Sequence, residues 1–270
     1  MFFSFIKKNL DERRFYAAAE KRLNDARNGV WPEDSEQWIR KNLSHSNWQV
    51  RNIVVKLIHR GKLLEFSPNL IQFLTSGLQV GFIRRNSAIA LASFESDDAI
   101  VEAFKIGLED PYWEVRTACA KGLAAQGRAD SELTELIIQK IYRKPLDKIP
   151  SYPIFRPKRI YREKNFEVRA ALFRVLGTVM AEKKHIHALE IPLEEDIWKV
   201  REAALEAFVN ASQRLGYTPE QVKETLSRLD LTSTEFIPTF PIRQTLSTLS
   251  ALHDEDMDNG LNNQVKHHAV

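Results

Sequence analysis

Apolar and small residues recur in this chain at alternating intervals of three and four positions. From Val115 they fall at 115, 118, 119, 122 and 123, which is the stripe that one face of an α-helix buries. The same spacing begins again at Val50, Val168 and Val200. These stripes predict long helices, and a shorter helix is expected before each of them. The shorter helices are predicted over 35–43, 68–75, 97–108, 131–142, 184–189 and 219–229.

A recurring phrase marks the start of each long helix: an aromatic residue followed three positions later by arginine. It joins Trp48 to Arg51, Phe82 to Arg85, Trp113 to Arg116, Phe166 to Arg169, Trp198 to Arg201 and Phe240 to Arg243. Successive arginines are 34, 31, 53, 32 and 42 residues apart. A period near 32 is the length of a helix pair, so the pattern predicts an all-α superhelix of five clear and one degenerate helix pairs.

The aromatic residue and the arginine of each phrase are interpreted as structural repeat residues. The aromatic residue would pack against the preceding helix where its own helix begins. The arginine would bind acids and carbonyls of its own or the neighbouring repeat. The alternatives are an exposed aromatic row that holds a partner and an arginine column that binds phosphate. On the solvent-facing side, where Ile83 and Ala90 are expected, the charges are mixed and turn acidic toward Glu202 and Glu206.

The third of these units resembles the HEAT-repeat family. The resemblance lies in the run from Leu108 to Arg116, with Asp110 six positions before the arginine, and in the small-residue helix that follows. Glu163 and Glu195 match the acid in two further units, whereas the first two units and the last lack it. The resemblance extends over about residues 33–252. It implies a stack of helix pairs and a macromolecular partner, because members of the family bind macromolecules of many kinds.

These patterns divide the chain into three parts. Residues 1–32 are predicted to form an N-terminal capping helix, 33–252 the HEAT-like array and 253–270 a disordered tail. The first eight residues are apolar and then basic, the reverse of a signal peptide, and weak contact with a membrane surface is the minor alternative. No stretch has the length needed to span a bilayer. With a single cysteine, Cys119, expected to be buried, the chain is assigned to the cytoplasm.

An insertion at 143–164 breaks the regular spacing. It contains four prolines, eight Lys or Arg and two acids, so its net charge is +6, while the whole chain carries +3 and the remainder therefore −3. Aromatic residues between the cations suit a phosphate, an acidic protein surface or anionic lipid. A solvated loop, or one packed back on the array, is the alternative. The candidate partner-binding residues are Lys148, Tyr152, Phe155, Arg156, Lys158, Arg159, Tyr161 and Arg162.

Nothing in the sequence indicates catalysis or a bound cofactor. Di-iron hydroxylases of HEAT-like fold carry His-Glu pairs, and none of the seven histidines here is followed by glutamate. No Gly-rich phosphate loop and no nucleophile motif is present. We therefore expect a non-catalytic, metal-free adaptor or scaffold that binds another protein. The alternatives are a nucleic-acid-binding or alkylpurine-glycosylase-like repeat protein and, third, an auxiliary subunit of a lyase.

Overall fold

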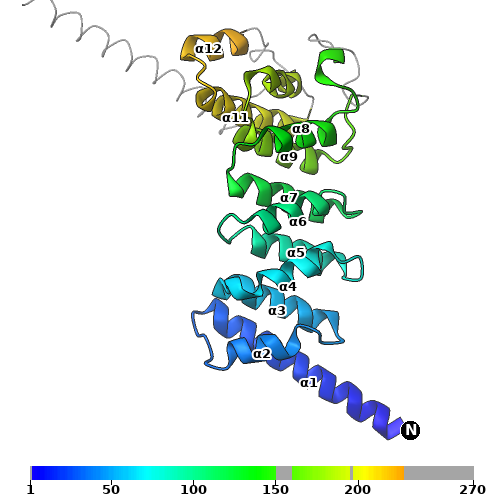
Figure 1. Cartoon of the computed structure of the whole chain (residues 1–270). Coiled ribbons are helices and arrows are strands. Elements are labelled where there is room, and N and C mark those ends of the chain that lie inside the picture. Colours follow the sequence, from blue (N-terminus) through cyan, green and yellow to red (C-terminus); the bar gives the residue numbers. More distant parts are fainter. Residues whose placement is uncertain (1, 150–159, 195–196, 228–270) are drawn as a thin grey trace, which may run out of the picture. The chain divides into compact units, whose positions relative to one another are not determined.

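The chain folds into helices throughout its described part. The computed structural model describes residues 2–149, 160–194 and 197–227. Every regular element in these ranges is helical, and the described chain adds one isolated β-bridge, between Tyr142 and Tyr161. This confirms the predicted all-α fold. The chain divides into two compact units, Met1–Gln126 and Gly127–Val270, each of which is a stack of neighbouring helices (Figure 1).

Unit 1 is a two-layered stack. One layer consists of α1, α3, α5 and α7, in which each helix packs against the next, and α2, α4 and α6 pack on the other side of α3, α5 and α7. This is the α–α superhelix that the stripes predicted. The bounds are α1 Phe2–Arg27, α2 Ser35–Asn42, α3 Trp48–Gly61, α4 Ser67–Thr75, α5 Gly81–Leu91, α6 Asp98–Gly107 and α7 Trp113–Gln126. A 3-10 turn, η1 Leu64–Phe66, precedes α4.

Unit 2 continues the alternation of shorter and longer helices. Its centre is the packing of α9 against α11, with α8 on α9 and α10 on α11. The bounds are α8 Ser131–Ile141, α9 Phe166–Val179, α10 His187–Glu190, α11 Trp198–Arg214 and α12 Pro219–Ser227, with 3-10 turns η2 Leu146–Lys148, η4 Lys183–His185 and η5 Ile191–Glu194. The helix expected over 184–189 is thus split into η4 and α10, and η5 follows it. Pro192, in η5, limits the extension of α10, because proline lacks the N–H that would continue the helix.

Five helix pairs are present in the described residues, from α2/α3 to α10/α11. α12 lies where the first helix of the degenerate sixth pair was predicted. The second helix predicted for that pair and the tail predicted at 253–270 fall outside the described residues. Small residues set the closest approaches between helices. A Cβ at Gly177 of α9 would lie 2.7 Å from the Cα of Ala207 on α11, so glycine allows the two backbones to meet.

Candidate binding surface

The repeat arginines bind the loops that lead into their own helices. The Nη1 of Arg51 donates to the carbonyls of His45 and Ser46, at 2.5 and 2.9 Å. Arg116 and Arg169 bind the carbonyls five and six positions before them in the same way, at 2.8–3.2 Å. Arginine side chains that bind carbonyls of their own loop fix its conformation. This geometry favours the structural interpretation over a phosphate-binding column.

In the second repeat the predicted arginine is wrong by one position. The aromatic residues Trp48, Trp113, Phe166 and Trp198 are the first residues of α3, α7, α9 and α11, but α5 begins at Gly81, one residue before Phe82. The fourth residue of α5 is therefore Arg84, which is buried, whereas Arg85 is exposed. With Arg84, the spacing of the arginines becomes 33 and 32 residues. The same shift places Ile83 and Ala90, which were expected to face solvent, in the core.

Arg84 joins two successive repeats. Its guanidinium binds the carboxylate of Asp110, with Nε–Oδ2 at 2.6 Å and Nη2–Oδ1 at 3.0 Å, and also donates to the carbonyl of Gln79. Both charged side chains are only 7% exposed. The hydrogen bond to Asp110 raises the pKa of Arg84. The guanidinium also lies over the ring of Tyr112, 5.3 Å from its centre, and that ring covers Gly81, where a side chain would crowd it.

The aromatic residues in the first turns of α3, α5 and α7 form an exposed aromatic row, defined by Trp48, Phe82 and Trp113. Their side chains are 39%, 62% and 40% exposed. The rings of Trp48 and Phe82 stack at a centroid distance of 6.2 Å and an interplanar angle of 17°. Packing at the helix start therefore covers only part of each ring. Because α3, α5 and α7 stack in sequence, the row follows one edge of unit 1.

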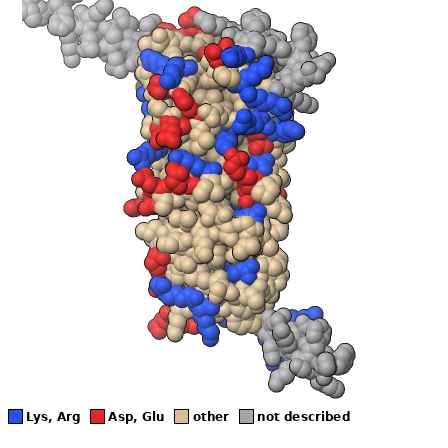
Figure 2. Space-filling model, turned by 45° about the vertical axis from the view of Figure 1, so that its right-hand side comes forward, with Lys and Arg blue, Asp and Glu red and all other residues tan. Residues whose placement is uncertain are grey.

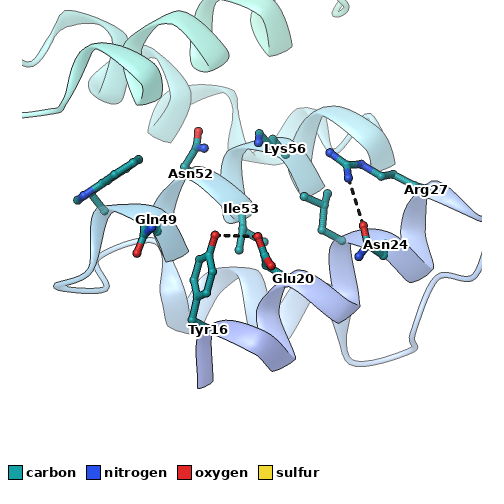
Figure 3. A pocket seen from close by; sticks show the side chains of 10 residues that line it. Tyr16, Glu20, Asn24, Arg27, Gln49, Asn52, Ile53 and Lys56 are labelled. Atoms are coloured by element: carbon teal, nitrogen blue, oxygen red, sulfur yellow. Dashed lines mark hydrogen bonds between the residues drawn. The ribbon is translucent and has the colours of Figure 1, made fainter. Parts of the chain in front are cut away.

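Neutral polar groups lie beside this row. The Nδ2 of Asn86 donates to the Oδ1 of Asn52 at 2.7 Å, which links α5 to α3. A cleft of about 280 Å³ between α1 and α3 extends from Trp48 past Asn52 to Lys56 and Arg27 (Figure 3). On the α1 side of this cleft, the hydroxyl of Tyr16 donates to Glu20 at 2.7 Å. The surface around the row is thus aromatic and amide-rich, with charges of both signs.

In unit 2, α9 and α11 correspond to the helices that carry the aromatic row. Their oppositely charged side chains form ion pairs with each other. Lys199 of α11 binds Glu167 of α9 at 2.5 Å, and Arg174 of α9 binds Glu206 of α11 at 2.9 Å. On the face shown in Figure 2, Lys and Arg gather at the upper right, and elsewhere in the upper half they alternate with Asp and Glu. The ion pairs of α9 and α11 therefore do not provide the continuous positive surface that a wrapped nucleic acid would require.

Three of the eight candidate residues in the insertion fall within the described chain. Lys148 and Arg162 are exposed. Tyr161 is only 2% exposed and stacks on Tyr142 at 5.5 Å, so its assignment as a partner contact is wrong: it packs in the core of unit 2. Ile149 is also buried, as the packed alternative expected. The other candidates, Tyr152, Phe155, Arg156, Lys158 and Arg159, lie outside the described residues.

The described residues contain neither a metal-binding cluster nor an exposed thiol. No group of three or more His, Cys, Asp or Glu that could hold a metal ion occurs among them. Cys119 is fully buried, and burial strongly raises the pKa of its thiol. A thiol with such a pKa remains protonated, and the thiolate is the reactive form. Among the described helices, none combines the length and apolar character that a membrane span requires.

Comparison with known proteins identifies no family. No family model and no curated protein matches the chain. A solved crystal structure described as an engineered protein shares 18% sequence identity with it at a TM-score of 0.48. The alignment covers 82% of this chain and 98% of the engineered one.

Proposed function

We propose that this protein is a non-catalytic, HEAT-like adaptor that binds another protein through the aromatic row of unit 1. The observation that carries the proposal is the exposure of Trp48, Phe82 and Trp113, of which Phe82 is 62% exposed. Large aromatic side chains dominate binding energy at protein interfaces. Exposed rings along one edge of a stable stack supply such anchors at little cost in conformational entropy.

The polar surroundings of the row suit a protein partner better than a nucleic acid. Asn52 and Asn86 offer amide donors and acceptors, which match a peptide backbone or polar side chains. Glu20 and Glu114 accompany Lys56 and Arg85 on the helices of this layer. Nucleic-acid binding draws most of its affinity from cations on phosphate, and this surface carries acids as well. Nucleic acid is therefore the second candidate for the partner. As to location, we propose the cytoplasm.

Binding to endogenous partners tests this proposal when two matched variants are compared. Phe82→Ser removes an exposed ring of the row, whereas Ile106→Ser removes a similarly exposed side chain, 56% accessible, from α6 in the other layer. The partner is a protein that co-purifies with the unaltered chain. Its affinity for the chain should fall about tenfold or more for Phe82→Ser, as expected for an interface anchor. For Ile106→Ser it should change less than about twofold. Circular dichroism melting curves check that both variants remain folded.

Two results would contradict the proposal. One is equal affinity of Phe82→Ser and the unaltered protein for every partner recovered. The other is recovery of partners that nuclease treatment or moderate salt abolishes. The second result would favour the nucleic-acid alternative, because affinity for phosphates falls steeply as salt rises.

A further inference from the structure

The isolated β-bridge between Tyr142 and Tyr161 joins the two ends of the insertion in unit 2. We call the paired segments, 141–143 and 160–162, the clasp; they form a ribbon of one bridged pair. Tyr142 and Tyr161 are bridged antiparallel, and the amides of Arg143 and Arg162 donate to the carbonyls of Ile160 and Ile141 at 2.9 and 2.7 Å. These bonds flank the bridged pair, so Tyr142 and Tyr161 form a non-hydrogen-bonded pair, whose side chains lie closest together. Their rings stack and pack on Phe173 in the core.

The clasp directs cations outward. Side chains alternate between the two faces of a strand, so burial of the two tyrosines turns the neighbouring Arg143 and Arg162 away from the core, and both are exposed. The Nε of Arg143 also donates to the carbonyl of Tyr161 at 2.8 Å, which holds its guanidinium across the ribbon. Tyr161 is held in turn by Arg169, whose guanidinium lies 4.6 Å from the ring centre.

More cations surround the ribbon. Lys140 lies on α8. Burial is the main cause that lowers the pKa of Lys140, and the positive charge of nearby Arg162 lowers this pKa further. Lys144 and Lys148 are exposed on the segment after Arg143. The described residues 140–149 and 160–164 contain six Lys or Arg against two acids. Of these acids, Glu163 accepts the amide of Asn165 at 2.9 Å in the turn before α9. The clasp patch is defined by the exposed cations Arg143, Lys144, Lys148 and Arg162.

The backbone that carries Arg143 and Arg162 is fixed by the clasp before any ligand binds. Like charges repel when they are held together, so folding alone gives no reason to gather them around a packed ribbon. A ligand carrying several carboxylates would relieve this repulsion. Because the tyrosines already fix the backbone of the clasp, binding requires less ordering of the protein. The order, position and charge of the patch thus point to the same class of ligand.

We propose that the clasp patch binds a short acidic segment of a partner protein. The inference extends the proposed adaptor function to a second contact, in a different unit from the aromatic row. A short segment fits better than nucleic acid because the patch is local. On α9 and α11, Lys199 and Arg174 are already paired with Glu167 and Glu206. A longer polyanion that reached these helices would gain no unpaired positive charge from either pair.

Fluorescence anisotropy of the full chain with a labelled decaglutamate peptide tests this inference, with decaglutamine as the uncharged control. In low salt of about 50 mM, where the screening length is still well above a contact distance, decaglutamate should bind and decaglutamine should not. Replacing Lys144, Lys148 and Arg162 by glutamine should weaken binding at least tenfold. A matched variant with glutamine at Lys41, Lys121 and Lys223, which are exposed elsewhere, should change it by less than threefold.

Three outcomes would overturn the assignment of an acidic peptide to the clasp patch. The first two are absence of decaglutamate binding and equal losses in the two triple variants, since equal losses indicate attraction by net charge alone. The third is tighter binding of a single-stranded oligonucleotide than of the peptide, with the same dependence on the clasp patch, which would favour nucleic acid. Phe82→Ser should still bind decaglutamate fully, so failure of the aromatic row as an interface would not be confused with failure of the clasp patch.

Discussion

At the residue scale, Asp110 has a larger structural role than its place in the repeat suggested. Its carbonyl accepts Arg116 of its own repeat, and its carboxylate binds the buried Arg84 of the preceding one. Asp110→Ala leaves that arginine charge buried without its acid, and we expect a loss of about 3–5 kcal/mol in the free energy of unfolding. Urea unfolding followed by circular dichroism measures this loss. Glu206→Ala, which breaks an exposed pair with Arg174, is the control and should cost at most about 1 kcal/mol.

Gly177 is required by its neighbour and not by its own backbone conformation. In the middle of a helix alanine normally stabilises by about 1 kcal/mol relative to glycine. At Gly177, however, the added Cβ would meet the backbone of Ala207, which cannot rotate away. Gly177→Ala should therefore lower the stability by about 1–3 kcal/mol through overpacking. Gly77→Ala, at a position with nothing within 4 Å, should leave the melting temperature nearly unchanged, and equal effects of the two substitutions would refute the packing argument.

At the element scale, buried and exposed residues alternate at the end of the insertion: Tyr161 is buried and Arg162 is exposed. Tyr161→Ala removes a buried ring that packs on Tyr142 and Phe173, and it should cost about 3–5 kcal/mol. Arg162→Gln, one residue further on the exposed face, should stay within about 0.5 kcal/mol. Thermal melting of the two variants tests this contrast. A variant with a shortened insertion should therefore keep both Tyr142 and Tyr161, the bridged residues of the clasp.

The helices were predictable from sequence where a buried stripe extended over two turns or more. The stripes from Val50, Val115, Val168 and Val200 all correspond to helices. The start of α5 was not predictable from the phrase, because Phe82 is the second residue and Gly81 accommodates the ring of Tyr112 from another repeat. The burial of Tyr161 also depends on contacts distant in sequence, which a charged and aromatic segment does not reveal. Exposure of the aromatic row is likewise a property of packing, which the pattern alone does not decide.

At the scale of the whole molecule, two histidines of unit 2 have opposite effects on the pH dependence of stability. Burial lowers the pKa of His185 below its ordinary 6.5, despite Glu135 at 3.8 Å. As the pH falls, His185 takes up a proton in the unfolded chain before it does so in the folded protein. Its contribution to stability is therefore present above pH 6.5 and declines as the pH falls below that value. The hydrogen bond to Glu190 raises the pKa of His187. Its contribution is present below pH 6.5 and is lost as the pH rises through the folded-state pKa.

Because these effects oppose each other, removal of either histidine should reveal the other. His185→Gln should make the protein less sensitive to acid between pH 7 and 5, a range around the ordinary histidine pKa of about 6.5. His187→Gln should make it more sensitive over the same range. Denaturant midpoints measured at several pH values test both expectations. If the denaturant midpoints of the two variants fall equally with decreasing pH, neither histidine controls the loss of stability in acid.

The burial of Cys119 gives unit 1 an internal chemical reporter. The thiol is fully buried, and a side chain added at Gly107 of α6 would collide with it. A thiol-specific reagent can modify it only after α6 and α7 separate, so the rate of modification measures how often that pair opens under native conditions. Since the chain has no other cysteine, the folded protein should react with such reagents only at the rate at which this pair opens. A cysteine introduced at an exposed position beside the aromatic row, or beside the clasp patch, could then carry a label with little background, allowing each surface to be followed separately.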